Sequence, residues 1–275
     1  MSKQFIIGIV LYQPTKTSIA RIKQIALSGY TIILFDNSFF ETSDFQNFIN
    51  IIYIHSPDNV GLSGGIDFIA NKAFDLKYYS LLNFDQDTIF TDKTLLFVEN
   101  VISKYIVSEK LGSNLITVGF RDFNKSGTNH IISIQDLFYN YSEVDFTINS
   151  GSLYVLKFYN KFKWFDKKYF VDGVDYSFSL QSNKYGYKII ECYATPDLNH
   201  TTEQDDTILN IFNFKIRGRK YSFKRNTDFI YSHIKLLIQS IVNLQTRHFT
   251  FLIKSLTIYC ITQSLFYFKK VKTRF

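Results

Sequence analysis

Leu81-Leu82-Asn83-Phe84-Asp85-Gln86-Asp87-Thr88 is the stretch of sequence that decides the fold, because an apolar run ends there in two carboxylates one residue apart. An apolar run of this length, bounded by polar residues, is typical of a buried strand in a parallel sheet. The aspartates then lie at the carboxyl end of the strand, where open α/β sheets bind their ligands. The stretch therefore predicts a ligand site at one edge of a parallel sheet.

Asp85 and Asp87 allow two interpretations. Carboxylates at positions i and i+2 can hold one hard cation, Mg²⁺ or Mn²⁺, together with the phosphate oxygens of a polyanionic ligand. The same residues could instead be ordinary loop acids, one of which caps the helix that is expected to begin near Thr91. A bare Asp-x-Asp pattern does not separate the two, so the rest of the chain has to be considered.

The segments before this stretch alternate between strand and helix patterns. Continuous apolar runs over residues 5–11, 30–35 and 49–54 predict strands. Apolar residues at helical spacing over 17–27 and 66–73 predict helices. This alternation, completed by the acidic strand, predicts a doubly wound nucleotide-binding half with a Rossmann-like sheet.

Asn59-Val60-Gly61-Leu62-Ser63-Gly64-Gly65 comes directly before the second of these helices. Unpaired N–H groups and the dipole at a helix N-terminus favour an anion, so the segment could cradle a phosphate. It matches neither the P-loop pattern nor the dinucleotide fingerprint. A flexible turn with a helix cap explains the segment equally well.

Length and charge set the class of protein. The 275 residues suit one large α/β domain with an appendage, or two small domains. The formal net charge of +7 favours partners that carry phosphate, or an anionic membrane face. Cys192 and Cys260 are too few for a disulfide framework or a thiolate metal site, so a reducing cytosolic setting is expected. The first residues lack an export signal, so export by that route is not expected.

The next segments of the chain, over 92–155, predict one more helix and two more strands. A helix over 92–108 and a strand over 115–120 are predicted, followed by a polar loop or hairpin over 121–143. Residues 146–155 are predicted to form a strand that is interrupted by the small-residue corner Ser150-Gly151-Ser152. Small side chains leave room for a ligand at such a corner, although a β-bulge without a ligand explains them too.

Beyond residue 205 the composition becomes basic and aromatic, and two helices are predicted between residues 229 and 268. Residues 249–268 approach membrane-spanning length, but Lys254 and several polar side chains argue against a transmembrane helix. We expect an amphipathic surface helix whose basic end, 269–274, lies on anionic lipid. A helical pair that packs on the first domain, or on a second subunit of a homodimer, is the alternative.

Six motifs and a later histidine follow one another over about residues 5–200. They are Ile9-Val10-Leu11-Tyr12-Gln13-Pro14, Asp36-Asn37-Ser38, the glycine segment 59–65, Asp85-Gln86-Asp87, Asn149-Ser150-Gly151-Ser152-Leu153, Phe170-Val171-Asp172-Gly173-Val174-Asp175 and His200. In this order they resemble the inverting glycosyltransferases of the GT-A class called family 2, and within it the rhamnosyltransferase-like branch.

The resemblance implies roles at a nucleotide-sugar donor. Tyr12 resembles the residue that stacks near the nucleobase, and Asp36 the carboxylate that hydrogen-bonds the base. Asp85 resembles the acid that meets the ribose or the diphosphate. The other residues expected at the donor are Asn59, Gly61, Ser150 and Gly151.

The resemblance also implies a divalent metal, Mg²⁺ or Mn²⁺, held by Asp87 and His200. A metal that bridges diphosphate oxygens neutralises charge on the departing nucleoside diphosphate, which supports this role of the acid chemically. Imidazole suits manganese at least as well as magnesium. A lone histidine is more often a structural or surface residue, and this alternative stays open for His200.

Asp175 resembles the catalytic base of the family, with Asp172 as the second choice. Inversion by direct displacement needs a carboxylate that takes the proton of the acceptor hydroxyl on the face opposite the leaving group. The alternative is that Asp175 only caps the helix that begins there. The chain departs from the family's pattern at Ser177 and Gln181, where relatives usually have an acid and an arginine, so local salt bridges and acceptor contacts differ.

Together these patterns predict an α/β GT-A catalytic domain over 1–205, with a mixed or parallel sheet and flanking helices, and a basic helical extension over 206–275. The expected activity transfers L-rhamnose from dTDP-L-rhamnose to a lipid-linked or growing cell-surface glycan, at the cytoplasmic face of the inner membrane. UDP-galactofuranose is the alternative donor, and a non-catalytic nucleotide-sugar- or glycan-binding module is the alternative function. The basic tail matches no nucleic-acid motif, so no nucleic-acid partner is expected.

Overall fold

The computed structural model describes residues 4–122, 141–200, 207–211, 214–218 and 220–272. The chain forms two compact units, Met1–Asn199 and His200–Phe275. Most of the loop predicted over 121–143 lies outside the described residues.

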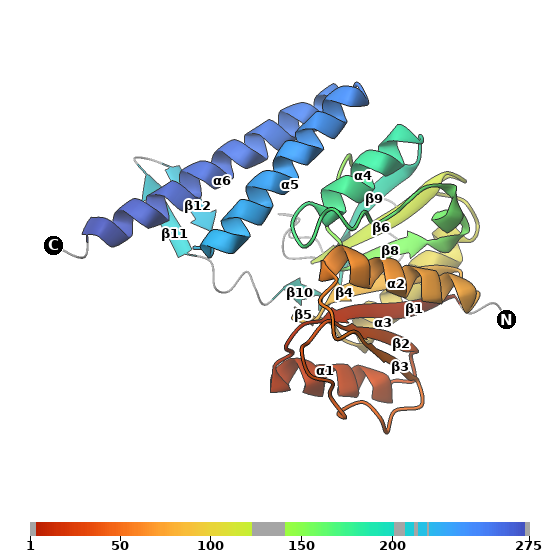
Figure 1. Ribbon diagram of the computed structural model, residues 1–275. Coiled ribbons are helices and arrows are strands. Elements are labelled where there is room, and N and C mark those ends of the chain that lie inside the picture. Colours follow the sequence, from red (N-terminus) through yellow and green to blue (C-terminus); the bar gives the residue numbers. More distant parts are fainter. Residues whose placement is uncertain (1–3, 123–140, 201–206, 212–213, 219, 273–275) are drawn as a thin grey trace. The chain divides into compact units, whose positions relative to one another are not determined.

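Eight strands form the central sheet of the first unit, in the order β3-β2-β1-β4-β8-β6-β9-β7 (Figure 1). The neighbours β3, β2, β1 and β4 run parallel, whereas β8 is antiparallel to both β4 and β6. The strands are β1 Phe5–Leu11, β2 Ile32–Asp36, β3 Ile51–His55, β4 Ser80–Asp85, β6 Leu115–Asp122, β7 Tyr141–Glu143, β8 Ser152–Val155 and β9 Lys188–Thr195. The sheet is therefore mixed, as predicted.

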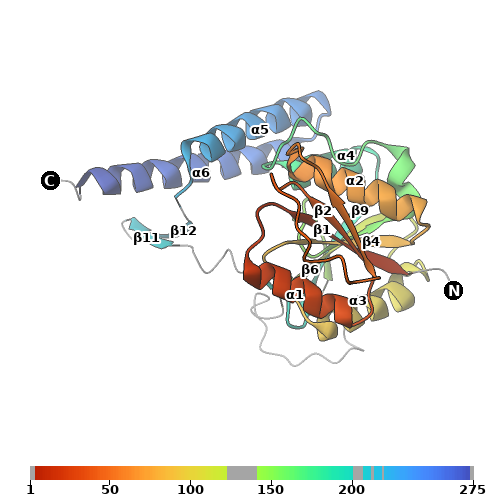
Figure 2. The same cartoon turned by 60° about the horizontal axis from the view of Figure 1, so that its bottom comes forward.

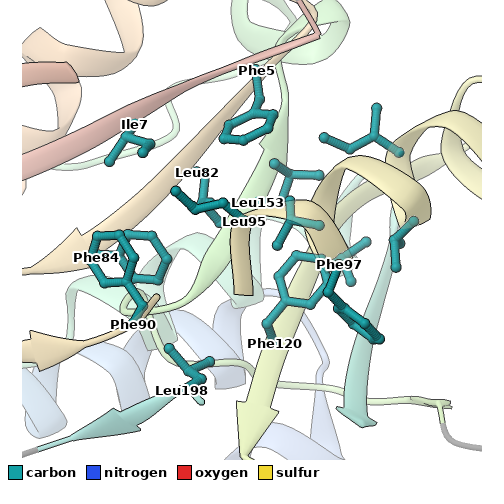
Figure 3. Close-up of a cluster of buried hydrophobic side chains, with 14 of the residues drawn as sticks. Phe5, Ile7, Leu82, Phe84, Phe90, Leu95, Phe97, Phe120, Leu153 and Leu198 are labelled. Atoms are coloured by element: carbon teal, nitrogen blue, oxygen red, sulfur yellow. The ribbon is translucent and has the colours of Figure 1, made fainter. Parts of the chain in front are cut away.

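Helices cover both faces of this sheet (Figures 1 and 2). On one face, α1 (Lys16–Leu27) and α3 (Asp92–Val101, continued by a π-helical turn over Ile102–Ile106) pack on alternate residues of β1 and β4. Side chains of this core are shown in Figure 3, where Phe84 stacks on Phe90 with ring centroids 3.8 Å apart. The other face carries α2 (Gly61–Asp75) and α4 (Val174–Lys184).

Because side chains alternate along a strand, Leu82 and Phe84 enter the core of α1 and α3 while Asp85 belongs to the opposite set. Asp85 thus lies on the face of the sheet that carries α2 and α4. The sequence pattern placed the acid at the end of the strand. The pleat of β4 decides which face it belongs to.

The start of α3 settles one of the two interpretations of the acidic pair. Thr91 is the N-cap of this helix, and its side chain accepts a hydrogen bond from the N–H of Lys93 while Thr94 completes a capping box. The hypothesis that Asp85 or Asp87 caps the helix is therefore wrong. A threonine supplies the same side-chain oxygen without burying a charge.

One further prediction differs from the structure in detail. Residues 146–151 are not a strand, because β8 begins only at Ser152 and the corner before it is an irregular turn. After β8 comes a 3₁₀ helix, Leu156–Lys161. A two-stranded sheet pairs β5 (Thr88–Ile89) with β10 (Asn199–His200).

The second unit consists of a β-hairpin and two helices. The hairpin joins β11 (Thr207–Ile211) to β12 (Phe214–Gly218) in antiparallel register. The helices are α5 (Phe223–Val242), which begins at the N-cap Ser222, and α6 (Thr246–Lys272). Both predicted helices are confirmed, and each is longer than the apolar pattern indicated.

Candidate active site at the carboxyl edge of the parallel strands

Three of the predicted site residues lie at the carboxyl ends of neighbouring strands. In the order β2-β1-β4, Leu11 pairs with Asp36 and Val10 pairs with Asp85. Tyr12 follows β1 directly, and its side chain is 50% exposed. The parallel register therefore brings Tyr12, Asp36 and Asp85 to one edge of the sheet, where open α/β sheets bind ligands.

Gln86 connects two of these strand ends, and sequence reasoning gave it no role. Its side-chain amide accepts a hydrogen bond from the Tyr12 N–H (2.9 Å) and donates one to the Tyr12 carbonyl (3.1 Å). The amide thus pairs with the Tyr12 backbone as a neighbouring strand would. Asp85 and Asp87, on either side of Gln86, are half-buried.

Asp36 is fully buried, and the protein already uses both of its carboxylate oxygens. One oxygen accepts a hydrogen bond from the Tyr53 hydroxyl (2.7 Å), and the other from the Ser38 N–H (2.8 Å). The contact with a nucleobase that the resemblance implies would require neighbouring side chains to move. In the described conformation Asp36 organises the end of β2.

The N–H groups at the start of α2 are also bonded to protein acceptors. Val60 donates to Asn37 Oδ1, Gly61 to Asn59 Oδ1 and Leu62 to the Phe170 carbonyl, over 3.1, 2.9 and 2.7 Å. Those three donors are therefore not directed at a phosphate in this conformation. The donor-binding role of Asn59 and Gly61 stays a prediction.

Both the backbone conformation and the packing at position 61 require glycine. Its φ of +76° is in the left-handed region, and a Cβ atom there would overlap the Phe170 carbonyl and lie 2.7 Å from the Phe170 ring. The glycine lets the start of α2 contact the segment that leads to Asp172 and Asp175. The glycine segment thus connects the two halves of the candidate site.

The small-residue corner at Ser150 and Gly151 is hydrogen-bonded to the turn that carries Asp85 and Asp87. Ser150 Oγ accepts a hydrogen bond from the Asp85 N–H (3.1 Å) and bonds the Thr88 hydroxyl (2.6 Å). Gly151 donates its N–H to the Asn83 carbonyl (2.8 Å), and a Cβ atom on it would lie 3.1 Å from the Phe120 carbonyl. Both residues are buried, and their contacts fix the turn that carries Asp85 and Asp87.

Arg121 anchors this corner, although sequence analysis placed it in a loop. Its guanidinium forms an ion pair with Glu191 (2.7 Å), donates to the Phe120 and Ser150 carbonyls (2.7 and 3.3 Å) and bonds the Thr147 hydroxyl. Both ion-pair partners are largely buried, at 11% and 16% side-chain exposure. A planar guanidinium presents five donors in a fixed fork, whereas a lysine ammonium has three donors on a single atom.

Asp175 lies in the first turn of α4. This helix, with α2, covers the face of the sheet to which Asp85 belongs (Figure 2). The N-cap of α4 is Gly173, so the interpretation of Asp175 as a mere N-cap is wrong. Its carboxyl is half-buried and accepts a hydrogen bond from the Tyr176 N–H (3.1 Å). Desolvation raises the pKa of Asp175 to about 6. Asp172 adds to this rise, while backbone hydrogen bonds and the charge of Arg121 oppose it.

Tyr154 is a buried tyrosine of β8 that no sequence signal indicated. Its buried hydroxyl donates to Asn149 Oδ1 (2.7 Å). Burial raises the pKa of Tyr154 well above its ordinary value, and the charges of Asp175 and Asp85 raise it further. The charges of Asp85 and Asp175, 90 residues apart in sequence, thus both act on the Tyr154 hydroxyl.

The acidic turn suits a divalent cation chemically. Asp85 and Asp87 offer two half-buried carboxylates on one turn, and Mg²⁺ and Mn²⁺ commonly complete their shells with phosphate oxygens and water. Within the part of the chain that the structure describes, no three His, Cys, Asp or Glu side chains come close enough to enclose a metal by themselves. The side chain of His200, the expected further ligand, lies outside that part.

Comparison with known proteins identifies the fold. No family model and no curated protein matches the sequence. Among solved structures, the chain is similar to the crystal structure of GalNAc-T7 with UDP, GalNAc and Mn²⁺, with a TM-score of 0.50 and 11% sequence identity. The match covers 72% of this chain and 43% of that one, so this chain spans less than half of its neighbour's length. At this identity the likeness shows the fold alone, which is of the GT-A class, as predicted.

Proposed function

We propose that this chain is an inverting glycosyltransferase that moves a sugar from a nucleotide-sugar donor to a glycan acceptor. The observation that carries the proposal is the half-buried carboxyl of Asp175, in the helix that covers the sheet face to which Asp85 belongs and with a pKa raised to about 6. A general base works best when its pKa is near the pH at which the enzyme operates. The GT-A fold, and a neighbour crystallised with UDP, GalNAc and Mn²⁺, support the same class of reaction.

In this proposal Asp175 accepts the proton of the attacking acceptor hydroxyl, and Asp172 is the second candidate. The new glycosidic bond forms on one face of the sugar while the bond to the diphosphate breaks on the other, which inverts the anomeric centre. Arg121 holds the corner beside the site and moderates the pKa of Asp175. Its part is to position the reacting groups rather than to react.

The donor would lie along the strand edge. Tyr12, half-exposed at the end of β1, offers an aromatic face to the base, and Asp85 meets the ribose or the diphosphate. Asp87, together with His200, would hold Mg²⁺ or Mn²⁺. When bound, such an ion neutralises charge on the leaving diphosphate.

We further propose L-rhamnose from dTDP-L-rhamnose as the donor and a cell-surface glycan as the acceptor. The motifs shared with the rhamnosyltransferase-like branch of family 2 support this choice, with UDP-galactofuranose as the alternative donor. The fold does not select among sugars, because the same carboxylates serve many nucleotide sugars.

The test is calorimetric binding and slow hydrolysis of a panel of nucleotide sugars with Mn²⁺, for the native chain and three variants. Asp87→Ala is expected to lose metal-dependent binding, and Asp175→Asn to keep binding but lose turnover. Asp58→Asn, an exposed loop aspartate, is the matched control and should behave as the native chain does. Binding without turnover in the native chain would instead support a nucleotide-sugar-binding module, and no binding with or without metal would reject the transferase and favour a glycan-binding module.

A further inference from the structure

The α5 helix has an inverted distribution of polar and apolar side chains. Its buried side chains include Ser232, His233 and Ser240, with Leu236 as the one fully buried apolar residue. His233 bonds the Ser255 hydroxyl of α6 (Nε2–Oγ, 3.3 Å), and Phe229 stacks on Tyr259 of α6 with ring centroids 3.6 Å apart. The side of α5 that faces α6 is therefore partly polar, unlike the inner face of a helix in water.

The opposite side of α5 is apolar and exposed. At about 100° per residue, seven large side chains fall on one side of the helix, and between 38% and 87% of each is exposed. We call them the α5 apolar face: Phe223, Ile230, Tyr231, Ile234, Ile238, Ile241 and Val242. Thr227 is the one polar residue within this strip, and an apolar strip of this length on a protein surface marks a contact with another apolar surface.

The charge around this face indicates what that surface is. Residues 200–275 contain 13 Lys and Arg against 4 Asp and Glu, whereas residues 1–199 contain 18 against 20. The positive net charge of the protein thus comes from its second unit alone. After Asp228 the sequence contains seven more Lys and Arg and no further acid.

Basic residues also flank the α5 apolar face itself. On the helix, Lys224 and Lys235 lie along one edge of the face, and the Lys235 ammonium is 3.8 Å from the centroid of the Tyr231 ring. An apolar strip edged by lysines is the arrangement by which helices lie in the plane of an anionic lipid surface. A second copy of the same basic unit would be repelled by its like charge.

We infer that the α5 apolar face binds an anionic lipid surface, with α5 parallel to the membrane plane. Lys235, midway along the helix, would be costly inside the hydrocarbon but favourable at the headgroups. Within the described residues one helical segment, Thr246–Tyr267 of α6, is long and apolar enough to cross a membrane, with 22 residues and a mean hydropathy of 1.3. Lys254 lies inside that segment, so the in-plane arrangement is the one we assign to the hairpin of α5 and α6.

The experiment is flotation of the full-length protein with two kinds of vesicle, phosphatidylcholine alone and equal parts phosphatidylcholine and phosphatidylglycerol. The native chain should float only with the second kind, and less so at high salt because ions screen the basic residues. Ile234→Gln with Ile238→Gln should lower the partition coefficient about tenfold or more, since two apolar side chains no longer enter the lipid. Glutamine is a good helix former, so α5 itself should be retained.

The matched control is Ile49→Gln, which makes the same change at a fully exposed isoleucine of the first unit and should bind as the native chain does. Lys224→Gln with Lys235→Gln should weaken binding to the anionic vesicles. Failure of the native chain to float with either vesicle would overturn the inference, as would undiminished flotation of the double isoleucine variant. A native dimer in sedimentation that the isoleucine substitutions convert to a monomer would assign the face to a second copy instead.

Discussion

The backbone N–H of Leu62 donates a 2.7 Å hydrogen bond to the carbonyl of Phe170, which joins the start of α2 to the segment that carries Asp172 and Asp175. Residues 108 positions apart in sequence are thereby held in contact at the candidate site. Gly61 makes this approach sterically possible.

Gly61→Ala is therefore expected to destabilise the protein by about 2–4 kcal/mol, from the positive φ and from overlap with Phe170 together. Gly29→Ala is the control, because Gly29 also has a positive φ (+86°) but open space around it. It should cost only about 1 kcal/mol. Urea unfolding of both variants measures the difference, and equal losses would show that the Phe170 contact contributes nothing.

Asp175→Asn should increase stability at high pH while abolishing transfer. The folded pKa of about 6 exceeds the ordinary value of 3.8, so the folded state holds this proton more tightly and loses stability as the pH rises between these values. Above pH 6 the full cost, about 3 kcal/mol, is present, and the amide variant avoids it. Thermal unfolding below pH 3.8 and above pH 6 checks this, since the gain should appear only in the second condition.

The transfer rate should rise with pH through about 6, because only ionised Asp175 can accept a proton. Asp172→Asn removes a like charge, lowers the pKa of Asp175 and should move this rise to lower pH. The groups that act on Asp175 are Asp172 and Arg121, so Asp145→Asn, an exposed substitution elsewhere, should leave the profile unchanged. If the pH dependence of the transfer rate were identical in Asp172→Asn and the native protein, this would argue against Asp175 as the base.

Arg121→Met should cost about 3–5 kcal/mol, because it leaves Glu191 as a buried carboxylate without its ion-pair partner. Changing both residues, Arg121→Met with Glu191→Gln, should recover part of that loss. Arg121→Lys keeps the charge but cannot reach the Phe120 and Ser150 carbonyls together, so the corner should loosen and kcat should fall more than stability does. Denaturation and kinetics of the three variants check these expectations. If Arg121→Lys matched the native enzyme in both stability and kcat, the guanidinium would not be needed to hold the corner.

The sequence alone determined most of the strands and the position of the acids at strand ends. Apolar runs such as 5–11 and 80–85 are local patterns, and each ends where polar residues begin. The two C-terminal helices also follow from local spacing. Predictions were wrong where two nearby residue types could make the same local contact. At the N-terminus of α3, for example, the side-chain oxygen of Thr91 or of a nearby aspartate could accept the capping hydrogen bond, and the structure uses Thr91.

Only the tertiary structure decided how the site is supported. The Arg121–Glu191 pair and the hydrogen bonds of the Gln86 amide to Tyr12 join residues 70 and 74 positions apart. Such contacts leave no periodicity in the sequence, because they depend on which strands become neighbours and which face each side chain occupies. The sequence by itself determined where chemistry could occur, whereas strand pairing and the pleat of the sheet determined which residues meet there.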